Sequence, residues 1–243
     1  MTKTPVPPDT STPEAGAAAG GWWEDPIDVV FSPFELFDRR RHARLLPPLL
    51  ILVAASLLLY LLMIPATDAI MRAAVADNPE AAAAIDQYGM LFRFMGALFV
   101  PVGVLVGLVW TAFLLWGFGR LFDIGAKFDR AMLVATYAGW ILVLAQLVAG
   151  LLLLAMGGDV ATDLTGPLSF GVLRFVDVEA MAPAMIPLLG RLDVFAIWQA
   201  VVWGIGLYVM FRASRVQAAG TAAAAWLLAA LPQVLWAMFR NPV

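Results

Sequence analysis

The sequence contains no cysteine and a single histidine, and both shortages narrow what the protein can be. Without cysteine there are no disulfides, no thiolate metal ligands and no cysteine nucleophile. The lone histidine, His42, cannot by itself build a metal cluster or a serine–histidine triad, and we interpret it as a solvated residue rather than a ligand of a pigment or haem. Sequence motifs of hydrolases, zinc proteases, calcium loops and phosphate-binding loops are also missing. We therefore predict no catalytic residues, no metal site and no cofactor, and interpret the protein as a non-enzyme.

Charge is scarce as well: 14% of the residues are charged, 62% are hydrophobic, and the formal net charge is −3. A soluble domain has about a quarter of its residues charged, and it could not hide so much apolar surface in one core. The small net charge argues against a nucleic-acid partner. Lipid is the solvent that fits this composition, so we expect an integral membrane protein.

Five segments free of Asp, Glu, Lys and Arg are long enough to cross a bilayer, which takes about 20 residues. They are residues 45–67, 94–119, 131–158, 194–211 and 216–239. The sequence therefore predicts an all-α membrane protein whose residues 45–239 form a five-helix transmembrane bundle. Every formal charge would lie at or beyond the rims of these spans, which disfavours proton-coupled transport.

The basic residues are unevenly distributed over the loops. With a cytoplasmic N-terminus, ten of the Lys and Arg residues fall on the inner side and five on the outer side. Positive charge concentrates on the cytoplasmic side of membrane proteins. We therefore predict a multi-pass protein of the cell inner membrane with a cytoplasmic N-terminus and an external C-terminus.

Two segments precede the first span. Residues 1–21 are rich in Pro, Ser, Thr, Ala and Gly and are expected to be a disordered cytoplasmic tail. Residues 22–44 are expected to form an amphipathic segment at the interface, with aromatics facing acyl chains and arginines meeting anionic head groups. This segment either tethers the first span or offers a docking surface to a cytoplasmic partner. The side chains expected to contact lipid or a partner are Trp22, Trp23, Phe34, Phe37, Arg39, Arg40 and Arg41.

Within this segment the sequence predicts one short helix from Pro33 to about Arg44. Ser32 and Glu35 have the spacing of a capping box, in which each side chain bonds a backbone N–H of the other residue. Pro33 then occupies the first helical position, where its missing N–H costs nothing. This helix would be the N-terminal interfacial amphipathic helix of the fold.

The two predicted outer loops differ in character. Residues 68–89 are Ala-rich and contain Asn78-Pro79, a helix start signal, so we expect the first two spans to extend out of the membrane as a helical hairpin. Residues 159–193 are too apolar for a free loop of that length. They either pack as an interfacial segment or cover the outer mouth of the bundle as a lid.

The polar residues inside the spans include three glutamines: Gln146, Gln199 and Gln233. In one reading they make hydrogen bonds between helices, each worth about 1 kcal/mol. In the other they line a polar conduit.

Helix breakers and small residues mark two of the spans. Pro101 in the second span and Pro232 in the fifth remove helix hydrogen bonds and should kink their helices. Gly103 and Gly107 follow at four-residue spacing, which is typical of close helix approach. Such breaks can also frame a binding site in transporters.

A short string entering the fourth span resembles a family signature. Its residues are Asp193, Phe195 and Trp198, followed by Gly206. Together with the Ser32-Pro33-x-Glu35-x-Phe37 entry ahead of the first span, the chain resembles the Yip family of Rab-interacting membrane proteins, in its bacterial form, over about residues 32–239.

The resemblance implies five spans with a cytoplasmic N-terminus and a function without catalysis. Eukaryotic members of that family are adaptors for small GTPases and vesicle proteins, and some bacterial members accompany ABC-type exporters. By analogy we expect a scaffold or accessory subunit of a larger inner-membrane assembly. Its partners would be membrane lipids and either other membrane proteins or a second copy of the chain.

The alternative is a small permease or a channel that handles lipids or solutes. It depends on the two prolines, the glutamines and the apolar outer loop, and it predicts a cavity that contains one or more of the glutamines.

Overall fold

The structure is a computed structural model that describes residues 21–75, 77–156, 169–178 and 180–240. Its elements in chain order are α1 (Asp25–Phe31), α2 (Pro33–Arg39), α3 (Leu46–Ala74), α4 (Pro79–Leu121), α5 (Phe128–Met156), the 3-10 turn η2 (Val172–Phe175), α6 (Met185–Leu189), α7 (Val194–Phe211), α8 (Arg215–Leu228) and α9 (Leu231–Arg240). The predicted disordered tail at residues 1–21 lies, except for Gly21, outside the described residues.

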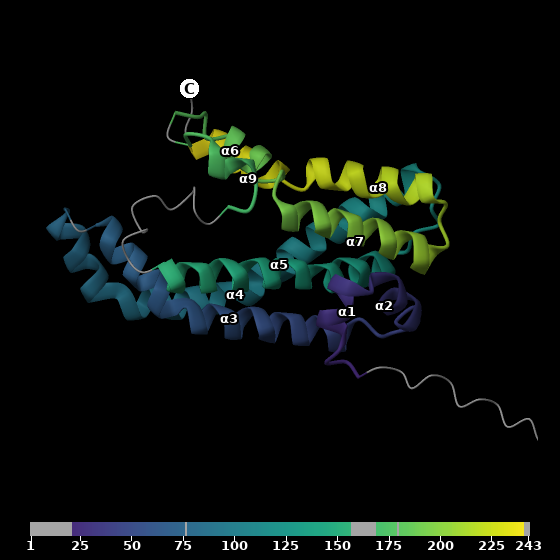
Figure 1. The fold of residues 1–243 in the computed structure, drawn as a ribbon, viewed down its shortest axis with the longest axis horizontal. Coiled ribbons are helices and arrows are strands. Elements are labelled where there is room, and N and C mark those ends of the chain that lie inside the picture. The colour runs from purple at the N-terminus through teal and green to yellow at the C-terminus, as the bar shows by residue number, and fades with distance from the viewer. Residues whose placement is uncertain (1–20, 76, 157–168, 179, 241–243) are drawn as a thin grey trace, which may run out of the picture.

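Five helical stretches within the described ranges are long and apolar enough to cross a membrane. Four of them are α3, α4, α5 and α7, and the fifth joins α8 and α9 over Arg215–Arg240. Figure 1 shows α3, α4, α5, α7 and α8 running along the long axis of the molecule. The predicted all-α five-helix transmembrane bundle is confirmed.

The hairpin predicted between the first two spans is present. α3 continues to Ala74, and α4 begins at Pro79 behind the N-cap residue Asn78, whose side-chain oxygen accepts a hydrogen bond from the Ala81 N–H at 3.1 Å. Polar contacts join the two helices beyond the apolar spans. Arg72 pairs with Asp86 at 2.8 Å, and Arg93 forms an ion pair with Asp68. Because α4 keeps its helical bonds through 43 residues, it is far longer than a bilayer requires.

α1 and α2 pack against one end of the bundle (Figure 1), in contact with α5 and α7. Phe37 of α2 is fully buried and meets the Tyr137 ring of α5 edge-on at a centroid distance of 6.1 Å. α5 is buried continuously over residues 131–139, and after Ile141 none of its residues over the described range 142–155 is buried. The bundle is therefore tightly packed beside α1 and α2 and looser toward its other end.

The single helix predicted from Pro33 to about Arg44 is wrong. The chain forms two short helices instead: α1 comes first, and α2 already ends at Arg39. Ser32 ends α1 with its backbone N–H bonded to the Asp28 carbonyl, and its side chain makes no capping bond to α2. The capping-box spacing was a local signal, and the packing of both helices on α5 and α7 overrode it.

The turns of the last three helices are fixed by identifiable residues. Arg212 adopts the left-handed conformation, with φ 54, and ends α7. Ser214 and Gln217 then form a capping box that starts α8. Between α8 and α9 the helix breaks just ahead of Pro232, as expected from a residue that lacks an N–H. The predicted kink in the fifth span is therefore a complete break.

Gly206 of α7 allows close packing in the tight end of the bundle. A Cβ atom at this position would lie 2.7 Å from Val134 Cγ1 and 3.0 Å from Phe37 Cζ. At Gly204, two residues earlier, the nearest atom to such a Cβ would be Ala222 Cβ at 3.6 Å, which is an ordinary contact.

We therefore expect Gly206→Ala to destabilise the protein through overpacking, by about 1–3 kcal/mol. The matched variant Gly204→Ala should leave stability unchanged or raise it slightly, since alanine favours helix. Thermal unfolding in detergent measures both. Equal melting temperatures for the two variants would contradict the role of Gly206 as a packing site.

Candidate ligand cavity

A cavity of about 710 Å³ lies between α3, α4, α5 and α7 and reaches the break between α8 and α9. Its volume is within the range of small-molecule sites, about 300–1,000 Å³. Its walls are mostly Leu, Val, Met, Ala and Gly side chains, with a few polar groups among them. An apolar cavity with a few convergent polar groups is the usual form of a ligand site.

All three glutamines predicted as intramembrane polar residues line this cavity. Gln199 is buried, and its Nε2 donates a hydrogen bond to the Ala138 carbonyl at 3.3 Å. In the amide orientation that satisfies its neighbours, Gln233 donates to the carbonyls of Ala230 and Ala229. Gln146 is exposed within the structure and lines the cavity from α5. Gln199 thus makes the hydrogen bond between helices that one hypothesis predicts. All three glutamines also border one cavity, as the other hypothesis predicts.

The break between α8 and α9 is tied to the cavity wall. Trp110 of α4 donates its Nε1–H to the Ala229 carbonyl at 3.3 Å, and Gln233 donates to the same carbonyl from the next helical turn. Both side chains line the cavity. Backbone carbonyls released by a helix break in a membrane need such donors.

Gly103 and Gly107 face the cavity rather than another helix. A Cβ atom at either position would meet no atom within 4 Å, and both residues line the cavity from α4. The prediction that they permit close helix approach is therefore wrong. That role belongs to other glycines, including Gly139, whose added Cβ would lie 2.7 Å from Leu52 Cδ2.

Arg191 is the one formally charged residue in the described lining of the cavity. It lies between α6 and the start of α7, and its guanidinium stands over the Trp226 ring of α8, 5.8 Å from the ring centroid. Burial lowers the pKa of Arg191. Arg191 stands three residues ahead of the fourth span, at its rim, and nevertheless borders the cavity. Sequence reasoning missed it because Arg191 precedes the fourth span and reads as an ordinary loop residue.

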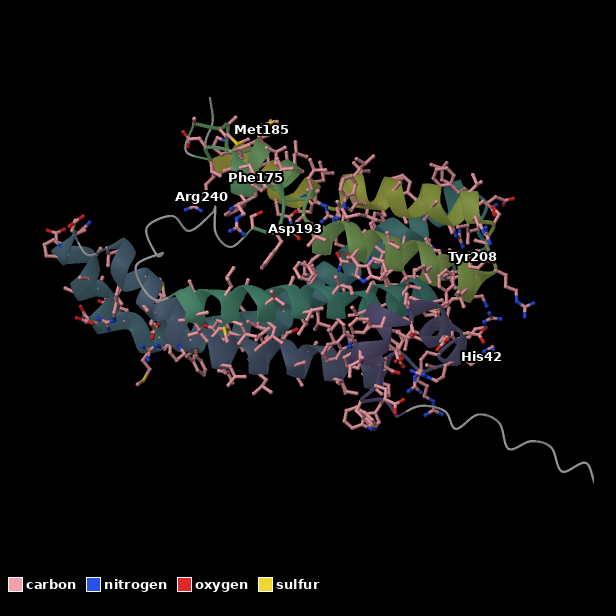
Figure 2. The ribbon with its side chains drawn as sticks, viewed as in Figure 1. His42, Phe175, Met185, Asp193, Tyr208 and Arg240 are labelled. Carbon is pink, nitrogen blue, oxygen red and sulfur yellow. The ribbon has the colours of Figure 1, made fainter. Side chains whose placement is uncertain are left out.

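The segment that carries Arg191 is held by the residues of the family-like string. Asp193 caps α7 by accepting the Phe195 N–H at 2.9 Å, and its other carboxylate oxygen accepts the Phe170 N–H at 2.9 Å. The rings of Phe170 and Phe195 meet edge-on at 5.3 Å, and Gly171 forms an isolated bridge with Asp193. Figure 2 shows Asp193 beneath Phe175 and Met185, away from His42.

The apolar segment ahead of α7, residues 159–193, is described only in part. Residues 157–168 and 179 lie outside the described ranges, while α6 packs beside α9 (Figure 1). Trp198, the third residue of the string, is partly buried on α7 and its buried Nε1 has no hydrogen-bond partner. The described part of the segment therefore packs on the bundle and also contributes Arg191 to the cavity.

A second hollow of about 740 Å³ lies between α7 and α8. It is lined chiefly by alanine, glycine and aliphatic residues, among them Ala218, Ala222 and Gly204. Because it offers few polar groups to recognise a ligand, the cavity that contains Arg191 is the better candidate site.

The aromatic and basic residues predicted to contact lipid or a partner divide into two groups. Trp22, Trp23 and Phe34 are 64%, 62% and 53% exposed, whereas Phe37 is buried. The arginines are paired within the protein, because Arg39 and Arg40 contact the carboxylate of Asp25, and Arg41 pairs with Asp38 at 2.9 Å. The expectation that Phe37 faces acyl chains is therefore wrong. The three arginines each form an ion pair with an aspartate of the protein.

Asp25 is the centre of an ion-pair network that closes α1 onto α2. It is 5% exposed, and its oxygens accept hydrogen bonds from Arg39 Nη2 at 3.0 Å and from Arg40 Nε at 3.0 and 3.1 Å. Burial opposes the charge of Arg39, but its hydrogen bonds to Asp28 and Asp25 outweigh that effect and leave the pKa of Arg39 raised.

We expect Asp25→Asn to loosen α1 and α2 from the bundle, at a cost of about 1–3 kcal/mol, since charged donors lose their buried acceptor. The matched control is Asp38→Asn. Its carboxylate is 72% exposed and pairs with Arg41 three residues away, so its loss should cost at most about 1 kcal/mol. Limited proteolysis near residue 32, together with thermal unfolding, compares the two. Identical cleavage rates would contradict the network's role.

The geometry defines an integral membrane protein whose five membrane-spanning stretches enclose a cavity. A family model described as the Yip1 domain matches residues 27–237, and the chain belongs to that family. No curated protein and no solved structure matches the chain.

Proposed function

We propose that this protein binds one amphiphilic molecule, a lipid or a lipid-like solute, in the cavity between its spans. The observation that carries the proposal is the cavity of about 710 Å³, with its apolar walls and its three glutamines. Two glycines on one wall leave space that a ligand can occupy. A packed bundle would instead have filled that space with side chains, because protein interiors are close-packed.

We further infer a binding or carrier role rather than catalysis. The described lining of the cavity includes no carboxylate and no histidine, the side chains that most often transfer protons in enzymes. The permease or lipid-handling alternative drawn from the sequence is thus the one that the cavity supports.

The proposed placement is the cell inner membrane, with α1 and α2 on the cytoplasmic side and the cavity reaching toward the external side. The distribution of basic residues supports it, with ten on the α1–α2 side and five on the other.

Filling the cavity tests the proposal directly. We expect Gly107→Leu and Gly103→Leu to fold normally, because each new side chain enters open space and leucine favours helix over glycine. Both should lose most of the amphiphile that the wild-type protein retains through purification in mild detergent. Native mass spectrometry measures retention as a bound mass per chain.

Gly117→Leu is the control for this experiment. Gly117 lies on the same helix, an added Cβ there would also meet no atom within 4 Å, and the residue does not line the cavity. Retention equal to wild type in the Gly107 and Gly103 variants would sink the proposal.

A second proposed role, as scaffold or accessory subunit of a larger membrane assembly, is favoured by a different surface. Trp22, Trp23, Ile27 and Phe31 are all more than half exposed on and ahead of α1, and large exposed aromatics are typical of contact surfaces. The occupant would be the membrane interface or a partner such as an exporter subunit.

Paired substitution of Trp22 and Trp23 by alanine tests this second role. We expect the variant to keep its cavity ligand but to lose a stoichiometric protein partner in co-purification from native membranes, because the two indoles would supply much of the contact area. Substitution of exposed Tyr88, at the opposite end of the bundle, is the control. The scaffold role fails if wild type itself recovers no stoichiometric partner.

A further inference from the structure

Arg191 lacks the partners that a buried guanidinium normally has. Its Nε and Nη2 atoms are both buried from solvent, and neither has a hydrogen-bond partner. Among the described residues no carboxylate lies within ion-pair distance of it. The other arginines with buried side-chain nitrogens, Arg39 and Arg41, each have an aspartate close by. Arg191 is therefore held in place without any of the charge compensation that the chain provides elsewhere.

Trp226 does not replace a carboxylate as a partner. Its ring faces the guanidinium at 5.8 Å, a distance at which cation–π attraction is modest. Stacking also leaves the N–H groups in the guanidinium plane unbonded, so two buried donors of a residue that lines the cavity remain without an acceptor.

The cavity holds another donor without an acceptor. Trp203 of α7 is 1% exposed, lines the cavity, and its Nε1 has no hydrogen-bond partner. The amide of Gln199, by contrast, already donates one of its two N–H groups to the Ala138 carbonyl. The unmet hydrogen-bonding capacity of the site is thus mainly that of donors, and its formal charge is positive.

Buried donors without acceptors are costly, and an unpaired buried charge is more costly still. A ligand group that removes this cost must accept several hydrogen bonds and carry negative charge. Carboxylates and phosphates do both, and the planar guanidinium binds either through two parallel bonds. A neutral head group would leave the charge of Arg191 uncompensated.

We propose that Arg191 binds the anionic head group, a carboxylate or a phosphate, of the amphiphile whose apolar part lies in the cavity between α3, α4 and α5. This inference rests on the proposed function, because it names the chemical class of the molecule that the cavity takes. The head group is placed at the start of α7, where Asp193 and the bridge to Gly171 fix the position of the arginine. The apolar tail extends along the wall that carries Gly103 and Gly107.

The test compares pairs of ligands that differ only in the head group. Oleate is matched with oleyl alcohol, and phosphatidate with diacylglycerol, each added to delipidated wild-type protein in mild detergent and measured by native mass spectrometry. We expect wild type to bind at least one of the acids about tenfold or more tighter than its neutral counterpart, as charged hydrogen bonds would produce. Preference for oleate assigns a carboxylate head, and preference for phosphatidate assigns a phosphate head. Inorganic phosphate should compete weakly, and competition equal to that of a lipid acid would overturn the amphiphilic part of the proposal.

Substitutions of Arg191 connect the preference to one side chain. Arg191→Gln should bind acid and neutral ligand equally, and Arg191→Lys should keep part of the preference, since it retains the charge but loses the planar pair of donors. Arg174→Gln is the control, because Arg174 is an exposed arginine of the same outer segment and does not line the cavity. Melting temperatures of all three variants show that each is folded.

Two failures are distinguishable in this experiment. Equal affinity for acid and alcohol in wild type, or an unchanged preference in Arg191→Gln, would overturn the inference about Arg191 while leaving the cavity as a binding site. If wild type binds neither member of either pair, and Gly107→Leu changes nothing, the proposed function itself fails.

Discussion

The packing of Phe37 against Gly206 and Tyr137 holds one end of the bundle closed, and the rest of the architecture depends on how far that packing extends. Glycine at position 206 lets an aromatic ring from α2 approach the α7 backbone, and α5 is buried continuously beside it over residues 131–139. Over residues 142–155 the side chains of α5 are no longer buried. The cavity occupies the space where close packing stops.

Membrane proteins cannot leave backbone groups unbonded in hydrocarbon, and the chain meets this constraint at its main irregularity. At the break before Pro232 the Ala229 carbonyl accepts hydrogen bonds from Trp110 and Gln233, and the Ala230 carbonyl accepts the Val234 N–H as well as the Gln233 amide. Arg191 is treated differently, because its buried nitrogens have no acceptor. The carbonyl at the break thus has donors from within the chain, whereas the unmet donors of Arg191 are those for which we propose an acceptor from a ligand.

The sequence predicted the features that depend on long runs of residues and on local caps. Charge-free segments identified five spans because hydrocarbon excludes ionised side chains, and the bounds of the fourth, residues 194–211, coincide with α7. Asp193 caps that helix and Arg212 ends it, so residues next to the helix determine both of its ends. Asn78-Pro79 likewise marked the start of α4.

Features that depend on contacts between distant residues were out of reach of the sequence. The capping-box spacing at Ser32 suggested one helix, but the decisive interaction is the pairing of Asp25 with Arg39 and Arg40, which lie fourteen and fifteen residues further along. The spacing of Gly103 and Gly107 is the same whether a glycine faces a helix or a cavity. The sequence around Arg191 resembles an ordinary loop. Its position at the cavity depends on the contact of α6 with α9, which the sequence does not indicate.

The closed end and the cavity are built on the same two helices, which connects the two proposed roles physically. α5 contributes Val134 to the contact with Gly206 and, one residue on, Ala135 to the cavity lining. α7 contributes Gln199 and Trp203 to the cavity and Gly206 one turn later to the closed end. Because close-packed side chains transmit small displacements, a ligand that changed the spacing of α5 and α7 would also change the packing of Phe37 against them. Phe37 belongs to α2, which packs beside the exposed aromatic surface of α1, so a ligand with that effect would couple occupancy of the cavity to the position of this surface.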